Sequence, residues 1–299
     1  MIAIDLGSNT IRFIEYDGQR WGKSFEKIVR TAEGLKQKNE ISALALDRII
    51  SAIDEAKSIL DFTSHEVVAI TTAAMRMAHN SQEILQKIQD RTEITFQIIN
   101  GEKEAKLTLK AVANRLDSLK IPSDDFILVD IGGGSTEIIV VSGGQIQVKS
   151  FPLGIVTLSE KAYITDILES ELKFYHEIIA DYIDELALLT PPKTLVMTAG
   201  TPTTMVAYQM GMNYVSYDAS KINGTFLKRS DCPIIHNALM EMDEKTRANY
   251  VGVGRETLIS TGIRIVEMIF EVLNKENALV IDDGLREGVA LNYYSEGYI

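Results

Sequence analysis

Short apolar runs alternate with longer segments of helical periodicity along most of the chain. Runs of strand length occupy residues 67–70, 94–99, 145–151, 195–197 and 278–281. Apolar residues recur every three or four positions in segments 42–60, 102–116, 166–189, 256–273 and 285–294, and Asn80 with Glu83 opens a further helix with a sequence typical of a capping box. Strands that alternate with helices predict α/β layers in which helices pack on mixed sheets.

One pattern occurs twice. Residues 2–14 and residues 127–140 each contain an apolar run, the triplet Asp-x-Gly, several small or hydroxyl residues and a second apolar run. This pattern predicts a β-hairpin with a glycine-bearing turn. Because the two hairpins lie about one domain length apart, we expect two related halves. We place the boundary between the two halves in the polar segment 118–124, which gives domains 1–121 and 122–299. The last helix of the chain is able to pack back on the first domain.

Composition narrows the class of protein. The chain has 299 residues, 45% hydrophobic and 24% charged, as in ordinary globular proteins. A single cysteine, Cys232, excludes an internal disulfide framework, and no apolar stretch is long enough to span a membrane. The N-terminus lacks a secretory signal, so we expect a cytoplasmic protein. A net charge of −12 disfavours general binding to DNA. An anionic ligand would need a local site built from backbone N–H groups, a few basic side chains or a metal ion.

The first hairpin turn carries chemistry suited to such a site. Gly7 allows a tight turn and a close approach to a ligand. The side chains of Ser8, Asn9 and Thr10 offer donors to phosphate oxygens, and Asp5 at the strand end can hold a metal-bound water. An ordinary turn rich in turn-forming residues accounts equally well for this segment alone.

The second hairpin turn favours a functional interpretation more strongly. Three consecutive glycines, 132–134, follow the strand and allow successive N–H groups to form an anion-binding nest. Ser135 and Thr136 add hydroxyl donors, and Glu137 adds a carboxylate for a cation. Because a simple hairpin rarely needs three glycines, two such loops indicate a phosphate-binding protein.

Four further segments have both a structural and a functional interpretation. Residues 198–204, with Gly200 and Thr201, fit either a capped connection or a helix N-terminus that binds an anion. Residues 101–105 fit either acidic residues favoured by the helix dipole or a general base. Residues 71–76 end in an arginine that fits either an ordinary solvent-exposed position or a contact with phosphate. Residues 282–288 contain an acidic pair at a strand end and are typical of a helix-capping segment. The chain has no P-loop and no H-E-x-x-H motif.

Taken in order, these motifs resemble those of one protein family. Segments 5–10, 72–76, 101–105, 130–137 and 283–288 are similar to the motifs of the exopolyphosphatase and guanosine pentaphosphate phosphohydrolase (Ppx/GppA) family within the actin-like ATPase superfamily. The resemblance implies an α/β fold of two actin-like (ribonuclease H-like) domains, with mixed sheets flanked by helices and an active site in the cleft between them. It also implies a hydrolase that removes the terminal phosphate of inorganic polyphosphate or the 5′-phosphate of pppGpp, with Mg²⁺, or Mn²⁺ in its place.

The resemblance assigns roles by position. Glu104 matches the catalytic glutamate, which activates a water, and Arg76 the phosphate-contacting arginine. The carboxylates assigned to the metal are Asp5, Asp130 and Glu137. The residues assigned to phosphate are Ser8, Asn9, Thr10, Gly132, Gly133, Gly134, Ser135, Thr136, Gly200 and Thr201. Where the family commonly has Glu-Glu-Ala, this chain has Glu-Lys-Glu-Ala at 102–105, so Glu102 is an alternative base.

Two other functions fit the same motifs. The chain is alternatively a small-molecule kinase of the actin-like superfamily, or a non-catalytic sensor that binds polyphosphate or pppGpp. A kinase needs an adenosine pocket, which we do not find in the sequence, and a pure sensor has no need of Glu104. We also expect Arg76, Lys103, Lys106 and Arg286 to offset the negative net charge near the substrate, and we expect a homodimer.

Overall fold

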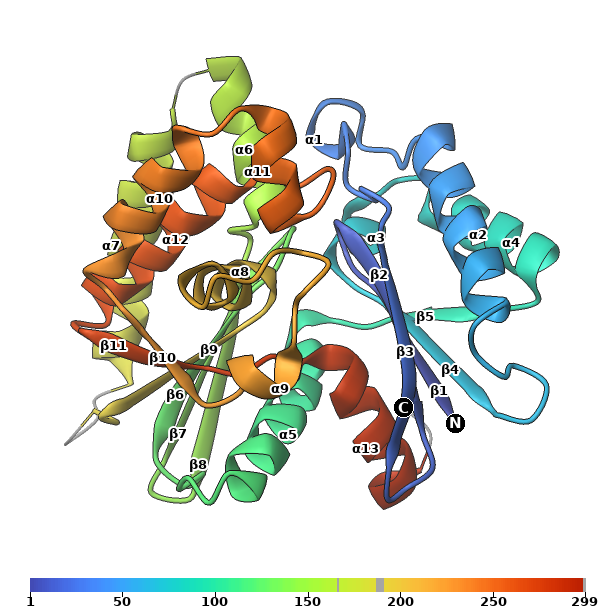
Figure 1. Cartoon of the computed structure of the whole chain (residues 1–299), viewed down its shortest axis with the longest axis horizontal. Helices are drawn as coiled ribbons and strands as arrows, with labels where there is room; N and C mark the ends of the chain where they lie inside the picture. The colour runs from blue at the N-terminus through green and yellow to red at the C-terminus, as the bar shows by residue number, and fades with distance from the viewer. Residues whose placement is uncertain (166, 187–190, 298–299) are drawn as a thin grey trace. The chain divides into compact units, whose positions relative to one another are not determined.

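The chain folds into two compact α/β units. The structure is a computed structural model that describes residues 1–165, 167–186 and 191–297. The first unit comprises Met1–Val112 and Asp283–Ile299, and the second comprises Ala113–Asp282 (Figure 1). The first division between the units falls between Val112 and Ala113, inside helix α5 (Gly101–Ser118). The boundary predicted from the sequence, between residues 121 and 122, lies just beyond the end of this helix.

The sheet of the first unit has five strands: β1 (Ile2–Leu6), β2 (Thr10–Tyr16), β3 (Trp21–Ile28), β4 (Val67–Thr71) and β5 (Phe96–Ile98). Their order is β3-β2-β1-β4-β5, with β1, β2 and β3 antiparallel and with β4 and β5 parallel to β1. Every residue of β1 is buried, as expected for a central strand covered on both faces. The sequence did not predict β3, because an exposed edge strand of mixed polarity lacks a clear apolar pattern.

The helices of the first unit are α1 (Leu35–Lys38), α2 (Ala43–Lys57), α3 (Ala73–Met77), α4 (Ser81–Thr92), α5 (Gly101–Ser118, which continues into the second unit) and α13 (Leu285–Glu296). Helix α2 packs on β2 and β3, and α13 packs on β1 and β2. In Figure 1, red α13 accordingly lies beside the blue strands. Gly288 of α13 lies so close to α5 that a Cβ there would stand 2.0 Å from the Leu107 carbonyl oxygen.

The sheet of the second unit repeats this topology and adds one strand. Its strands are β6 (Phe126–Ile131), β7 (Thr136–Ser142), β8 (Gln145–Phe151), β9 (Thr194–Thr198), β10 (Thr225–Lys228) and β11 (Asn277–Val280). The order is β10-β11-β9-β6-β7-β8, in which β6, β7 and β8 are antiparallel and β9 and β11 run parallel to β6. The predicted pair of related halves, each opened by a hairpin, is therefore present in the fold.

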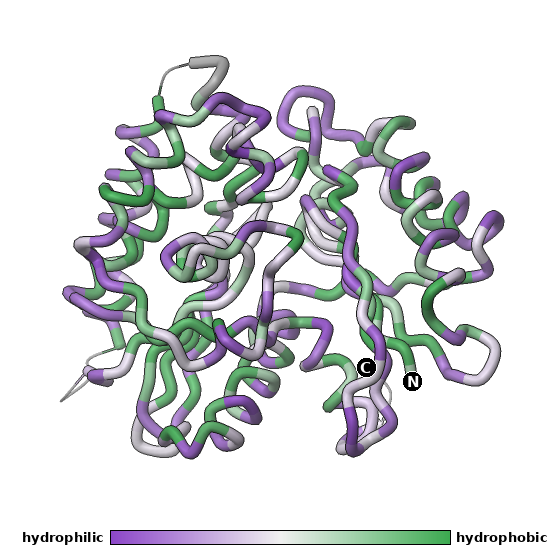
Figure 2. Tube along the Cα trace, in the orientation of Figure 1, coloured by the Kyte–Doolittle hydropathy of each residue, from purple (hydrophilic) through white to green (hydrophobic). Residues whose placement is uncertain are grey.

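Helices of the second unit pack around a hydrophobic core. They are α6 (Ile155–Thr165), α7 (Leu168–Glu185), α8 (Gly200–Gln209), α9 (Ala219–Ile222), α10 (Asp231–Met240), α11 (Glu244–Val251) and α12 (Ile259–Val272). Helix α12 is the central one, since it packs against α6, α7, α8 and α10 and is largely buried. The hydropathy of the trace follows this arrangement, with apolar central strands and polar outer helix faces (Figure 2). The predicted helix 166–189 corresponds to α7, and residues 166 and 187–190 lie outside the described residues.

The capping box predicted at Asn80 is absent. Asn80 precedes α4, but its side chain makes no capping hydrogen bond to that helix. Its Oδ1 accepts from the Ile41 backbone N–H at 2.9 Å, and its Nδ2 donates to the Ile41 carbonyl at 3.0 Å. Asn80 thus fixes the segment before α2, a tertiary contact that a local sequence pattern does not reveal.

Candidate active site

A partly buried ion pair joins two elements of the first unit. Glu104 lies in the first turn of α5, and its residue is 9% exposed. Its Oε2 accepts a hydrogen bond at 2.9 Å from Nη1 of Arg76, which lies on α3. The same Nη1 donates at 2.7 Å to the Ile99 carbonyl at the end of β5. The guanidinium therefore holds both the carboxylate and the strand end, and fixes the orientation of Glu104.

The N-terminus of α5 is capped, which fixes the turn that carries Glu104. Asn100 Oδ1 accepts from the Lys103 backbone N–H at 2.8 Å, and the Asn100 carbonyl accepts from the Glu104 N–H at 3.0 Å. This is the geometry of an asparagine N-cap. A carboxylate in the first turn is also favoured by the helix dipole.

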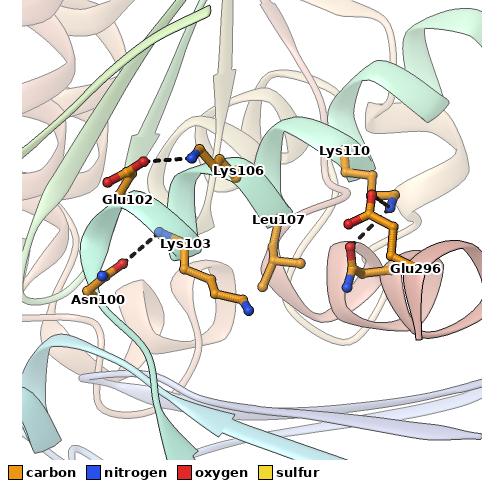
Figure 3. Close-up of a pocket in the computed structure, with 8 residues that line it drawn as sticks. Asn100, Glu102, Lys103, Lys106, Leu107, Lys110 and Glu296 are labelled. Carbon is orange, nitrogen blue, oxygen red and sulfur yellow. Dashed lines mark hydrogen bonds and ion pairs between the residues drawn. The ribbon is translucent and has the colours of Figure 1, made fainter. Parts of the chain in front are cut away.

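The two glutamates of this turn lie in different environments. Glu102 is exposed, and its Oε1 accepts at 2.6 Å from Nζ of Lys106, one turn further along α5 (Figure 3). The hydrogen bond and the charge of Lys106 lower the pKa of Glu102 below its ordinary value. Glu104 is buried and held by an arginine, whereas Glu102 forms a solvent-exposed pair of a common type.

The first hairpin loop is fixed by backbone hydrogen bonds. Gly7 N–H donates to the Thr10 carbonyl at 3.0 Å and closes the turn. The carbonyls of Ser8 and Asn9 accept from N–H groups of residues 29, 30 and 32, which follow β3. Asp5 and Ser8 are buried, at 6% and 4% exposure. The side-chain oxygen of Asn9 is buried with no hydrogen-bond partner among the described residues.

The glycine loop of the second unit is shaped by the start of α6. The carbonyls of Gly132 and Gly133 accept from the N–H groups of Ile155 at 3.0 Å and Val156 at 2.8 Å. Because the C=O and the following N–H of a trans peptide point in opposite directions, the N–H groups of Gly133 and Gly134 point away from α6. Whether these N–H groups bind an anion, as the sequence predicts, stays a prediction.

Two neighbours of this loop explain its close packing. A Cβ on Gly154 would lie 2.3 Å from the Gly134 Cα, so the residue that precedes α6 must be glycine. Thr136 is fully buried, and its hydroxyl donates to the Leu153 carbonyl at 2.6 Å. That hydroxyl has a structural role that the sequence did not reveal, since it is already used in a hydrogen bond within the unit.

Asp130 and Glu137 are direct cross-strand partners in the β6–β7 ladder. Glu137 is 1% exposed, and its Oε1 accepts from the Ser150 hydroxyl at 2.6 Å. Two carboxylates placed opposite each other repel unless a cation or proton lies nearby. Their oxygen chemistry fits Mg²⁺, which prefers hard oxygen ligands. Among the described residues no three acidic, histidine or cysteine side chains gather into a metal site, and Asp5 belongs to the other unit.

The third loop brings in an arginine that the sequence did not assign. Gly200 begins α8, and a Cβ on it would lie 2.3 Å from Nη2 of Arg255. The Arg255 guanidinium therefore packs against the helix N-terminus that was predicted to bind phosphate. Thr201 is 1% exposed and lies against Gly262 of α12. The signal that the sequence offered was an arginine preceded by two glycines, Gly252 and Gly254, which both adopt positive φ.

The remaining basic residues expected near the substrate are mostly engaged. Arg286 Nε lies 2.6 Å from Glu287 Oε1. Glu287 Oε2 accepts a hydrogen bond from the Gly284 N–H and so caps α13, as predicted for a capping segment at 282–288. Lys106 is paired with Glu102, and Arg76 with Glu104. Lys103 forms no ion pair with the side chains that the structure describes.

The repeated topology of two mixed sheets flanked by helices is consistent with the two-domain actin-like fold. The chain belongs to the Ppx/GppA phosphatase family, whose profile matches residues 23–296. None of the helices within the described ranges is long and apolar enough to cross a membrane.

Individual relatives agree with this assignment. Exopolyphosphatase 1 of Mycobacterium tuberculosis is 28% identical over 97% of this chain and 86% of its own length, and Exopolyphosphatase 2 of the same species is 27% identical over 97% of both. The crystal structure of the Aquifex aeolicus PPX-GPPA enzyme has a TM-score of 0.73 at 29% identity and covers 97% of this chain and 98% of its own. The crystal structure of an exopolyphosphatase from Cytophaga hutchinsonii shares the fold, with 22% identity and a TM-score of 0.83. The match covers 99% of this chain and 97% of the other.

Proposed function

We propose that this protein is an exopolyphosphatase that releases the terminal phosphate of inorganic polyphosphate. The observation that carries the proposal is the arginine-held, buried Glu104 on a capped helix turn, in a chain whose other unit has a glycine nest. The relatives named as exopolyphosphatases support the choice of polyphosphate.

The proposed reaction is one hydrolysis step. The oxygen of a water attacks the terminal phosphorus in line, and the anhydride P–O bond to the next phosphate breaks. Glu104 accepts a proton from the water and later releases it to solvent. The products are orthophosphate and a chain that is one phosphate shorter.

The other residues stabilise charge on the transferred group. Donors that are in place before the reaction act most strongly, because they do not have to reorganise. In the first unit these are Arg76 and the Ser8–Thr10 loop; in the second they are the N–H groups of the 132–134 loop and the start of α8 at Gly200 and Thr201. Asp130 and Glu137, which face each other across β6 and β7, would hold Mg²⁺ or Mn²⁺, which when bound neutralises phosphate oxygens.

Guanosine pentaphosphate is a second candidate substrate. Its 5′-terminal phosphate is also joined by an anhydride bond, so the same nest, arginine and base serve both substrates. The Aquifex aeolicus neighbour carries both enzyme names in its description. Direct comparison of the two substrates distinguishes them.

The test is phosphate release from long-chain polyphosphate and from pppGpp, with Mg²⁺ and with Mn²⁺, by wild type, Glu104→Gln and Glu102→Gln. Loss of a general base lowers kcat by about 100-fold or more, and we expect a fall of this size in Glu104→Gln. The fall in kcat for Glu102→Gln should be smaller by a factor of at least about ten.

The control is Glu83→Gln on α4. Glu83 forms an exposed pair with Lys87 of the same i,i+4 type as Glu102 with Lys106. Release unchanged by this variant shows that loss of such a pair is harmless. Full activity of Glu104→Gln would contradict the proposed base, and a larger loss in Glu102→Gln would transfer the role to Glu102. Binding of both substrates without release by wild type would identify a sensor.

A further inference from the structure

A threonine at the end of β4 lies between the first hairpin loop (residues 7–10) and the segment that leads to α5. Thr71 is the last residue of β4 and is fully buried. In the sheet it is paired with Leu6 of β1 on one side and with Ile98 of β5 on the other. Thr71 therefore contacts both the strand that enters the hairpin loop and the strand that precedes the helix of the proposed base.

The hydroxyl and the carbonyl of Thr71 contact different strands. Its Oγ1 donates to the Leu6 carbonyl at 2.8 Å, directly before Gly7 opens the hairpin turn. The Thr71 carbonyl accepts from the Ile99 N–H at 3.0 Å. Leu6 is also fully buried and Ile99 is 3% exposed, so water does not replace a partner that is lost at either position.

The same connection continues to the proposed base. The Ile99 carbonyl accepts a hydrogen bond at 2.7 Å from Nη1 of Arg76, and this nitrogen also donates to Glu104 Oε2 at 2.9 Å. A continuous series of hydrogen bonds thus leads from the Leu6 carbonyl through Thr71 to the Glu104 carboxylate. All of its members belong to the first unit.

The Thr71 hydroxyl is not required by the strand itself. Valine has nearly the same shape as threonine, and both residues favour β-strands, so a valine would fill this position of β4 equally well. Because Thr71 is fully buried, its hydroxyl does not touch a substrate either. What the hydroxyl adds is the hydrogen bond that fixes the entrance of the hairpin loop relative to β4.

We infer that Thr71 is a positioning residue, which sets the distance between the first hairpin loop and Glu104. The inference rests on the proposed function, because it takes the loop as a contact of the transferred phosphoryl group and Glu104 as the base. In-line attack needs the water at a fixed place relative to the phosphorus, and a displacement of about 1 Å costs up to about 100-fold in rate. Loss of the hydroxyl therefore lowers kcat more than it raises KM.

Thr71→Val removes the hydroxyl and keeps the shape of the side chain. We expect kcat for phosphate release from polyphosphate to fall about tenfold while KM changes by less than about twofold, since the base moves relative to the loop but the substrate contacts are kept. Thr71→Ser keeps the hydroxyl, so we expect its kcat to stay within about twofold of wild type. Full kcat in Thr71→Val, or equally slow turnover in Thr71→Ser, overturns the inference.

The matched control is Thr92→Val on α4, a helix that carries none of the proposed site residues. Thr92 is 1% exposed and its hydroxyl donates to the Ile88 carbonyl at 2.7 Å, so this variant also loses a buried hydrogen bond from a hydroxyl to a carbonyl. We expect a loss of stability in urea similar to that of Thr71→Val, with the kcat of wild type. An equal fall of kcat in the control would mean that lost stability alone explains the effect, and the positioning role would be wrong.

Hydrogen–deuterium exchange of the full chain separates this inference from the proposed function, because it requires no activity. We expect segments 6–10 and 99–104 to exchange about threefold faster or more in Thr71→Val than in Thr92→Val. If wild type releases no phosphate and both segments respond, the hydrolase proposal fails and the connection through Thr71 stands. If wild type releases phosphate and one segment or neither responds, the connection fails and the hydrolase stands.

Discussion

At the residue scale, the main result is that two glutamates in one helix turn have different environments. Their spacing of two residues sends the side chains in different directions from α5, so one meets Arg76 and the other meets Lys106. The sequence left both open as the base, because the local motif is acidic at both positions. The resemblance favours Glu104, and its contact with Arg76 of α3, which is distant in the sequence, supports that proposal.

Arg76 offers a prediction at this scale. One nitrogen, Nη1, contacts both the Ile99 carbonyl and Glu104, so removal of the side chain leaves a buried carboxylate without that partner. We expect Arg76→Ala to lower the free energy of unfolding by about 1–3 kcal/mol. We expect its kcat for phosphate release to fall about 100-fold, as for loss of a preorganised donor. Urea unfolding and phosphate release measure the two effects.

Arg76→Lys is the informative comparison for that prediction. A lysine keeps the charge but lacks the planar group that serves two acceptors in fixed directions. Stability close to wild type with a large loss of kcat supports a role in substrate contact as well as in packing. Equal recovery of both properties by lysine would show that the charge alone matters.

At the element scale, glycines decide how closely elements approach. Gly154 lets the start of α6 lie against the glycine loop, and Gly288 lets α13 lie against α5. Most strands and long helices were predictable because their apolar periodicity is local. Edge strand β3 and the short helix α3 were not, since their stability comes from neighbours rather than from their own pattern.

Gly288→Ala tests this packing. In an ordinary helix interior, replacement of glycine by alanine stabilises by about 0.5–1 kcal/mol. Here the new Cβ would stand 2.0 Å from the Leu107 carbonyl oxygen, so we expect destabilisation by about 1–3 kcal/mol instead. Urea unfolding followed by circular dichroism measures the sign, and an increase in stability would refute the close approach.

At the scale of the whole molecule, two units of one topology each carry half of the candidate machinery. The base and its arginine belong to the first unit, whereas the nest and the Asp130–Glu137 pair belong to the second. Such a division explains why single motifs were weak indicators and why their order along the chain was informative. The homodimer and the cytoplasmic location stay predictions.

Cys232 offers a probe of the second unit, because it is the single cysteine of the chain and is fully buried in α10. Burial raises the pKa of its thiol to about 12. Since the reactive thiolate forms only near that pH, we expect no alkylation of the native protein at pH 8 and complete alkylation in urea. Mass spectrometry before and after unfolding measures this, and rapid modification of the native protein would contradict the packing of α10.

The sequence by itself determined the α/β class, the two related halves, the hairpin loops and the family. These features depend on periodicity and on glycine, aspartate and hydroxyl residues close together in the chain. Only the tertiary structure distinguished Glu104 from Glu102, gave the Thr136 hydroxyl to Leu153 and brought Arg255 to Gly200. Each of these is a contact between residues far apart in sequence or a choice between side-chain directions, and such contacts are decided by packing rather than by local pattern.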